Sequence, residues 1–278
     1  HILLDSLQKI CLMHGIEVDY YKKLFQTAGN IIELIEKDDI PKYLLFLENV
    51  FPYMDNYNYQ KGMKEIIQEL KNFLKPKDIG TDSDRALLLD FQATLEIKPE
   101  KAIKLEKDAL AQIENITADN ARLVSNLHAN LGGLYRMNGH PDLAREHMEK
   151  SISLLDQFNL LHINDSIPQI ANYAMFLTEQ QEPERGISEL QKLSGIIKEY
   201  HSDDCLDYAK VQETLGTIYL MTANLPQAKT HFKRAFKIYE KIWADEPEMI
   251  EAKYQEIQEL YPQIGFCIGK NLSGLLTK

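Results

Sequence analysis

A pattern of bulky and small residues recurs along this chain at intervals of 42 residues. Each of four copies has a bulky residue at the same position, namely Leu89, Leu131, Tyr173 and Leu215. A small residue follows thirteen positions later, and three copies place another small residue seven positions beyond that one; the two sets are Ala102, Ala144, Gly186 and Ala228, then Ala109, Ser151, Leu193 and Ala235. Residues seven apart lie on one face of a helix, so each copy presents a strip of small residues to a bulky neighbour. The pattern therefore predicts pairs of antiparallel helices that approach each other closely.

Such pairs must also stack on one another. A single helical hairpin leaves half of its apolar surface in water, and neighbouring hairpins bury that surface. In the last copy we expect Leu215, Tyr219 and Phe232 to fill the space around Ala228 and Ala235. We assign these bulky residues to packing rather than to a cofactor site. The chain is predicted to be all-α, an α-solenoid built from helical hairpins.

Breaks in the pattern divide the chain. Two helices are expected first, followed by a degenerate hairpin in which Pro52 bends the first helix and Gly62 falls out of register. Each regular copy has a proline near the start of its second helix, where the missing N–H has no helical partner in any case. The predicted segments are 1–39 (N-terminal helices), 40–80 (degenerate hairpin), 81–244 (four repeats, about 84–115, 121–158, 166–200 and 207–243) and 245–278 (a capping helix and a tail).

The segment 130–139, Asn-Leu-Gly-Gly-Leu-Tyr-Arg-Met-Asn-Gly, carries the clearest family resemblance. With the recurring small and bulky positions, it resembles the tetratricopeptide repeat, usually about 34 residues long, in the longer form found in kinesin light chains. It also resembles the C-terminal repeats of bacterial signalling ATPases with an NB-ARC nucleotide-binding domain (the STAND class). The resemblance covers about 84–243 well and 43–74 loosely. It implies a right-handed superhelix whose first helices line a concave groove.

The resemblance also indicates which side chains face that groove. They lie on the first helix of each hairpin, at fixed offsets from Gly132 and its equivalents. The candidates are Asn126, Asn130, Gly133, Arg136 and Met137 in the second repeat, Asn172, Met175 and Glu179 in the third, and Lys210, Glu213, Thr217 and Met221 in the fourth.

Asn130 and Asn172 occupy the same position of the repeat, where kinesin-light-chain-like repeats place an asparagine in the groove. The fourth repeat departs from this pattern with Thr214. An amide both donates and accepts hydrogen bonds, so a row of asparagines can hold the backbone of an extended peptide. Methionines beside them would supply adaptable apolar pockets. The alternative interpretation is that these asparagines bond to the ends of neighbouring helices.

Composition limits the class of partner. Lys and Arg number 31 against 42 Asp and Glu, a net charge of −11, which disfavours nucleic acid and anionic membranes. Three widely spaced cysteines make no disulfide framework, and the sequence has neither a long apolar stretch nor a signal peptide. These features favour a cytoplasmic protein. Because the sequence opens at His1 rather than methionine, we expect a part of something longer; a homo-oligomer is left open.

Motifs for chemistry are weak. Residues 265–271 resemble a phosphate-binding loop but have too few residues between the glycines and an asparagine where Ser or Thr binds Mg²⁺. The cluster from His201 to Cys205 contains groups that could bind a metal, yet Ser and Asp at a repeat junction are typical helix caps. We therefore predict no catalytic residues, no cofactor and no metal, and we do not expect an enzyme.

Two functional hypotheses follow. The first is a protein- or peptide-binding scaffold that forms the ligand-sensing part of a larger signalling protein. The second is the receptor domain for short signalling peptides in a quorum-sensing-type transcriptional regulator. An upstream nucleotide-binding domain would favour the first and a helix-turn-helix domain the second. The chain's own C-terminal tail could also occupy the groove.

Overall fold

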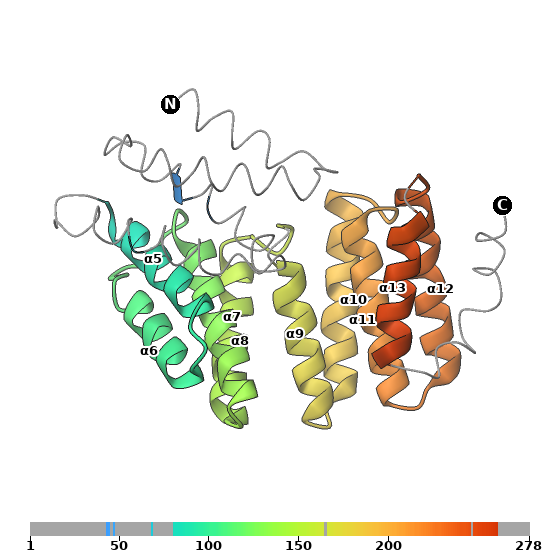
Figure 1. Ribbon diagram of the computed structural model, residues 1–278, viewed down its shortest axis with the longest axis horizontal. Coiled ribbons are helices and arrows are strands. Elements are labelled where there is room, and N and C mark those ends of the chain that lie inside the picture. Colours follow the sequence, from blue (N-terminus) through green and yellow to red (C-terminus); the bar gives the residue numbers. More distant parts are fainter. Residues whose placement is uncertain are drawn as a thin grey trace. The chain divides into compact units, whose positions relative to one another are not determined.

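The computed structural model describes residues 43, 44, 47, 68, 80–163, 166–245 and 247–260 (Figure 1). In these ranges the regular secondary structure is entirely helical, which confirms the predicted all-α class. The helices expected in 1–39, most of the degenerate hairpin and the tail after 260 lie outside the described residues. The helices are α5 (Asp82–Thr94), α6 (Pro99–Leu110), α7 (Ala121–Met137), α8 (Pro141–Gln157), α9 (Ser166–Glu179), α10 (Pro183–Tyr200), α11 (Leu206–Met221), α12 (Leu225–Ile242) and α13 (Pro247–Leu260).

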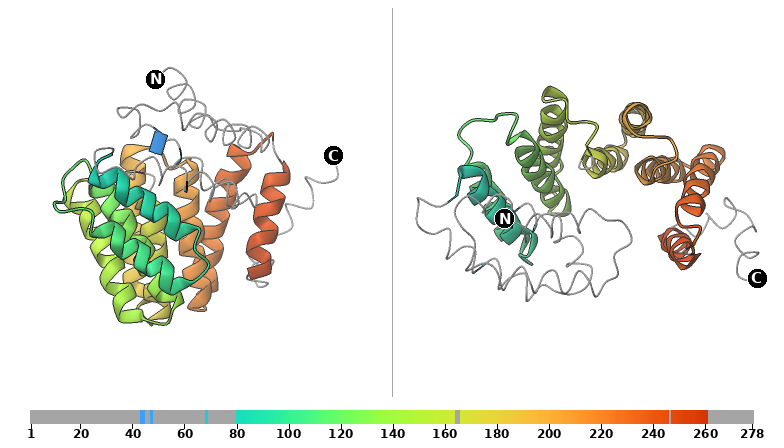
Figure 2. Two further views of the ribbon diagram at one scale, coloured as in Figure 1. Left: turned by 60° about the vertical axis from the view of Figure 1, so that its left-hand side comes forward. Right: turned by 90° about the horizontal axis from the view of Figure 1, so that it is seen from above.

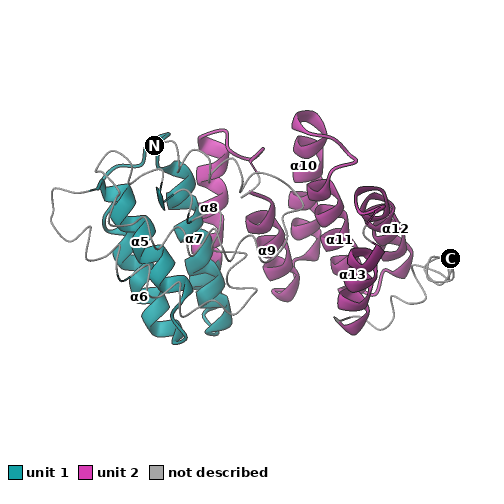
Figure 3. Ribbon diagram, turned by 45° about the horizontal axis from the view of Figure 1, so that its top comes forward, with its two compact units in different colours: residues 1–144 teal, residues 145–278 magenta. Residues whose placement is uncertain are grey.

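The chain forms two compact units, residues 1–144 and 145–278, and the boundary falls within α8 (Figure 3). In the first unit α6 packs against α5 and α7, and α5 also contacts α7. In the second unit α9 to α12 pack in chain order, α9 also contacts α11, and α13 packs on α12. Figure 2 shows the helices of this second unit side by side from two further directions. Within each unit, therefore, two first helices are neighbours: α5 and α7 in the first, α9 and α11 in the second.

The recurring small positions are buried. This confirms the packing on which the predicted hairpins depend, since a small side chain facing water could not let two helices nest. The buried small residues are Ala102, Ala109, Ala144, Ser151, Gly186, Ala228 and Ala235, together with Gly132, Ala174 and Gly216, which directly follow the recurring bulky residue; Leu193, the one leucine at these positions, is buried as well. In the second unit they contribute to a core that extends from Leu155 to Ile257.

Two glycines show how closely the helices approach. A methyl group added to Gly216 would lie 2.9 Å from the ring of Phe232, so the glycine on α11 makes room for the aromatic ring on α12. A methyl group on Gly186 would lie 2.6 Å from the backbone oxygen of Ala174. A flexible ring can shift, but the backbone of α9 cannot do so cheaply. Gly186 is therefore the tighter of the two contacts.

Two glycine-to-alanine changes on α10 should have opposite effects. We expect Gly186→Ala to lower the free energy of unfolding by about 1–3 kcal/mol, because the new methyl group forces α9 and α10 apart. Gly195→Ala is the matched control: its methyl group meets nothing within 4 Å, and alanine raises stability in a helix by about 0.5–1 kcal/mol. Urea denaturation measures both. Equal effects of the two changes would contradict the close approach at Gly186.

The turns inside the hairpins repeat as well. Gly139, Gln181 and Ala223, again 42 residues apart, have φ values of 74°, 65° and 58°. In each case the next N–H bonds to the carbonyl oxygen five residues back, at 2.9, 2.8 and 2.7 Å, which is the Schellman helix ending. Prolines stand at the first or second position of α6, α10 and α12, and α8 begins at Pro141, as the sequence predicts. The same turn therefore reverses the chain after α7, α9 and α11.

Candidate ligand-binding surface

In the second unit, α9 and α11 are the neighbouring first helices, and they carry the predicted groove residues of the third and fourth repeats. Asn172 is exposed, and its amide makes no hydrogen bond to the described part of the chain. Glu179 is also exposed and has a polar contact elsewhere in the chain. Met175 is half-buried and packs against the core. Asn172 is thus the polar group on α9 with bonding capacity to spare.

On α11 the predicted residues differ in their surroundings. Lys210 is exposed and lies 3.8 Å from the Asp207 carboxylate on the same helix. Thr217 is half-buried, and Met221 is 43% exposed. The carboxylate of Glu213, by contrast, is engaged within the chain.

Glu213 connects three helices. It accepts a hydrogen bond from the Tyr239 hydroxyl on α12 at 2.6 Å and forms an ion pair with Lys253 on α13 at 2.9 Å. Burial raises the pKa of the Tyr239 hydroxyl, and the charge of Glu213 adds to the effect, so this phenol remains a donor. The contacts indicate that Glu213 holds α12 and α13 to α11. Its participation in a ligand site stays a prediction.

In the first unit, α7 carries the candidates of the second repeat. Met137 is 75% exposed, and a side chain added at Gly133 would meet nothing within 4 Å, so the surface there is open. Asn126 and Arg136 are half-buried and have partners in the chain. Asn130 is exposed but donates a hydrogen bond from Nδ2 to Oδ1 of Asp90 on α5, at 2.8 Å. This bond joins Asn130 to a neighbouring helix, as in the alternative interpretation, although Asp90 lies within α5 and not at its end. Asn130 and Asn172 belong to different units, so the ladder predicted from them stays a prediction.

Asn130 contacts one of two adjacent carboxyl groups, a pair that the sequence analysis did not identify. Glu106 on α6 is only 1% exposed and is hydrogen-bonded to the half-buried Asp90. The Glu106 Oε2 atom is buried without a hydrogen-bond partner. We call Asp90, Glu106 and Asn130 the acid cluster; its members come from α5, α6 and α7.

The repeat pattern contained a signal for this cluster. Glu106 stands at the position that Met148, Leu190 and Phe232 occupy in the other copies. Asp90 stands at the position of the small residues Gly132, Ala174 and Gly216. The first repeat thus has two acids at the positions where the other copies have a bulky apolar residue and a small one.

The two carboxyl groups cannot both ionise easily. Burial raises the pKa of Glu106 to about 10, and the neighbouring charge of Asp90 and its hydrogen bond add to the effect. Burial also raises the pKa of Asp90, against the hydrogen bonds from Glu106 and Asn130 that lower it. At neutral pH Glu106 therefore keeps its proton and donates it to Asp90.

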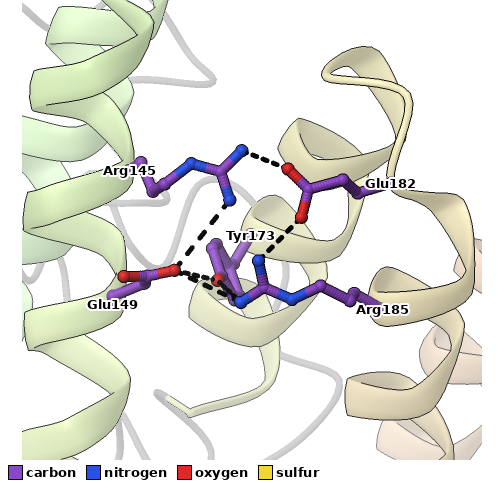
Figure 4. A network of polar contacts seen from close by, with 5 residues as sticks. All are labelled: Arg145, Glu149, Tyr173, Glu182 and Arg185. Carbon is purple, nitrogen blue, oxygen red and sulfur yellow. Dashed lines mark hydrogen bonds and ion pairs between the residues drawn. The ribbon is translucent and has the colours of Figure 1, made fainter.

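A second polar network lies in the second unit (Figure 4). Glu182, the residue before α10, accepts hydrogen bonds from Arg145 on α8 at 2.5 Å and from Arg185 on α10 at 2.7 Å. Glu149 on α8 accepts a bond from the Tyr173 hydroxyl at 2.7 Å and lies 3.3 Å from Arg185. The two arginines and the two glutamates carry opposite charges, so the network has no net charge. The network joins the turn before α10 to α8 and α9, and this arrangement indicates a structural role.

The network shifts the pKa values of its members, and one of its residues differs from its equivalents in the other copies. Hydrogen bonds from Arg185 and Arg145 lower the pKa of Glu182, and burial and the bond to Glu149 raise that of Tyr173. The Arg145 guanidinium also lies 5.5 Å from the centre of the Phe176 ring. Tyr173 stands where the other copies have leucine, which was the available signal.

The junction before α11 was predicted to contain a helix cap. Cys205 is the capping residue: its Sγ accepts a bond from the Tyr208 N–H at 3.5 Å. The cap is therefore a cysteine, not the serine or aspartate expected, and Asp204 forms an ion pair with Lys241. Among the described residues no three His, Cys, Asp or Glu side chains are grouped so that they could hold a metal ion. No helix of the described ranges has the length and apolar character needed to span a bilayer.

Comparison with known proteins identifies the fold. Residues 166–241 match the family model of the tetratricopeptide repeat. A structure of BtubC (BKLC) from P. vanneervenii is 18% identical, with a TM-score of 0.57, over 74% of this chain and 82% of that one. A Podosopora anserina protein named for kinesin light chain, with nearly identical TPR-like repeats, is 11% identical, with a TM-score of 0.52, over 83% and 99%.

A further similar structure contains a ligand. A Rap protein complexed with Competence and Sporulation Factor is 16% identical, with a TM-score of 0.54, over 94% of this chain and 74% of that one. No curated protein matches the chain in sequence. These likenesses confirm the predicted α-solenoid of the tetratricopeptide type. The resemblance to NB-ARC-containing ATPases stays a prediction.

Proposed function

We propose that this chain binds an extended peptide or protein segment along the exposed surfaces of its first helices. The observation that carries the proposal is the exposed amide of Asn172, which has no partner in the described part of the chain. An amide in this state can donate one hydrogen bond to a peptide backbone and accept another. The exposed side chains of Lys210 and Met221 on the adjacent α11 offer a charge and an apolar contact to the side chains of the ligand.

The fold supports a binding role. Stacked hairpins present long rows of side chains, and repeat proteins of this kind use such surfaces to hold partners. The Rap protein that shares the fold is complexed with Competence and Sporulation Factor. This likeness favours our second candidate function, a receptor for short signalling peptides. In either case we assign the chain a non-catalytic, ligand-sensing role in cytoplasmic signalling. The coding sequence around this segment separates the two: a nucleotide-binding domain supports a signalling ATPase, and a helix-turn-helix domain supports a transcriptional regulator.

Asn172→Ala tests the proposal. We expect peptides selected on the wild-type chain from a phage-displayed random library to bind this variant at least about tenfold more weakly, because backbone hydrogen bonds are lost. The melting temperature should stay nearly unchanged, since the amide has no described partner. Gln191→Ala, which removes an exposed amide from the second helix α10, is the matched control and should bind normally. A large fall in the melting temperature of Asn172→Ala would favour a structural role.

A further inference from the structure

We propose that the exposed face of α12 is a docking surface for an acidic segment of a partner protein, which its basic side chains bind through carboxylate groups. This surface lies on a second helix, whereas the ligand of the proposed function contacts first helices, so the two proposals are independent. We call the basic side chains of this face the basic strip; they are Lys229, Lys233, Arg234, Lys237 and Lys241.

The first argument is geometric, because the five side chains share one face of the helix. Lys229, Lys233, Lys237 and Lys241 follow one another at intervals of four residues. Residues four apart are neighbours on a helix surface, so the lysines form a row about 18 Å long, at about 1.5 Å of rise per residue. Arg234 lies beside this row, one turn from Lys237. All five side chains are exposed, and the buried residues of α12 lie on the opposite face.

The second argument is that folding alone does not account for the strip. Lys241 forms an ion pair with Asp204. The other four side chains make no ion pair or hydrogen bond in the described part of the chain. Like charges four residues apart lower the stability of a helix, and the row contains three such pairs in succession. A strip that opposes helix formation and has few partners within the chain is better explained by a partner outside it.

The third argument is that the other second helices lack this charge. α12 has five basic residues and one acidic residue, a formal net charge of +4. α6 and α10 each have three basic and three acidic residues, and α8 has two basic and four acidic ones. The whole chain has a net charge of −11, so the residues outside α12 carry −15. α12 is thus a positive surface on a negative protein, and it favours a negatively charged partner.

The size and chemistry of the strip favour carboxylates on a single segment. The row is one helix wide, and about seven residues of extended chain, with alternate side chains on the same side, span its length. Four of the five side chains are lysines, which act as flexible point charges, whereas arginine is the usual side chain for planar contacts with phosphate. The negative charge of the remaining chain also repels large polyanions such as nucleic acids and anionic membranes.

The strip also indicates the strength of the contact. Leu225 and Ile242, at the two ends of α12, are its only exposed large apolar residues, so no apolar anchor lies within the row. Binding therefore depends on exposed charges, which salt screens strongly. We expect a fast, reversible contact that weakens as the ionic strength rises.

The test uses a fluorescently labelled peptide of about eight residues in which glutamate and serine alternate. We expect fluorescence anisotropy to detect its binding to the wild-type chain at about 20 mM salt and to show its loss at about 0.5 M, where charges are screened. Lys233→Glu combined with Lys237→Glu should weaken binding at least about tenfold. Lys101→Glu with Lys104→Glu, two exposed changes on α6, is the matched control: it alters the net charge equally and should keep the affinity within about twofold. Circular dichroism should show that both variants fold, since all four sites are exposed.

The outcomes identify the occupant. No binding of the glutamate peptide, or equal weakening by the two double variants, would overturn the proposal. Tighter strip-dependent binding of single-stranded oligothymidine or of phosphatidylserine vesicles would assign the surface to nucleic acid or membrane instead. A dimer of the wild-type chain in sedimentation that Lys233→Glu with Lys237→Glu dissociates would make a second copy the occupant, which also contradicts the proposal. Asn172→Ala should bind the glutamate peptide normally, so failure at the strip leaves the proposed function intact.

Discussion

Replacing Ala228 with glutamate should unfold the last hairpin and lower its free energy of unfolding by more than about 4 kcal/mol. Ala228 is 0% exposed and lies in the core of the second unit, where α12 packs against α11. A carboxyl group there has neither space nor a partner. Protonation would reduce the cost of burying the charge, but the larger side chain would still push the two helices apart. The small residue is therefore a condition for the hairpin to form.

The chain contains a probe for this experiment. Its single tryptophan, Trp243, lies at the end of α12 and stacks on Tyr239 at 4.9 Å between ring centres. Urea denaturation followed by Trp243 fluorescence thus reports on the hairpin that is altered. Thr230→Glu introduces the same charge at an exposed site two residues away and should change stability by less than about 0.5 kcal/mol. Similar midpoints for the wild type and Ala228→Glu would contradict the assignment of Ala228 to the seam.

The fold was predictable because its determinants are local and periodic. The closeness of two helices joined by a short turn depends on side chains within one hairpin, and those side chains repeat in the sequence. Gly186 and Gly216 show the principle: each is small because a backbone atom or a ring lies directly against it. The turn prolines follow from the same local logic, since the first helical N–H groups have no partner. The division into four repeats between 81 and 244 remains a prediction.

The candidate site was less predictable because equal positions in the repeat have different neighbours. Asn130 and Asn172 are equivalent in sequence, yet Asn130 bonds to Asp90, forty residues earlier. The residue forty positions before Asn172 is Gly132, which has no side chain to accept a bond. The bond of Asn130 thus depends on a residue that only the first copy has at that position. A search for positions at which one copy differs in residue type from the other three would have revealed Asp90 and Glu106.

The contacts of Glu213 were unpredictable for a different reason. Its partners come from α12 and α13, and Tyr239 and Lys253 stand at positions that the repeat pattern does not connect with Glu213. Ion pairs of this kind form only after the helices have packed, so spacing along the chain gives no signal for them. The network around Tyr173 is similar, because its two arginines come from different hairpins.

The stability of the first unit should fall as the pH rises, and Glu106→Gln should reduce this dependence. The folded chain holds a proton on Glu106 up to a pKa of about 10, whereas the unfolded chain releases it near the ordinary value of 4.5. Between these values the folded state binds more protons, so the free energy of unfolding decreases with pH, by up to about 1.4 kcal/mol per unit. Below 4.5 both states are protonated and the effect disappears.

The measurement is the difference in unfolding free energy between Glu106→Gln and the wild type, from urea denaturation followed by far-ultraviolet circular dichroism at about pH 5, 7 and 9. Titrations of groups that do not interact with Glu106 are common to both proteins and cancel in the difference. We expect the unfolding free energy of the glutamine variant, relative to that of the wild type, to increase steadily from pH 5 to pH 9. The reason is that its amide keeps the hydrogen bond to Asp90 without a proton to lose. Glu100→Gln, at an exposed position of the same helix, should show no such trend. A constant difference for Glu106→Gln would mean that the carboxyl group ionises as readily in the folded chain as in the unfolded one. A protonated donor to Asp90 would then be ruled out.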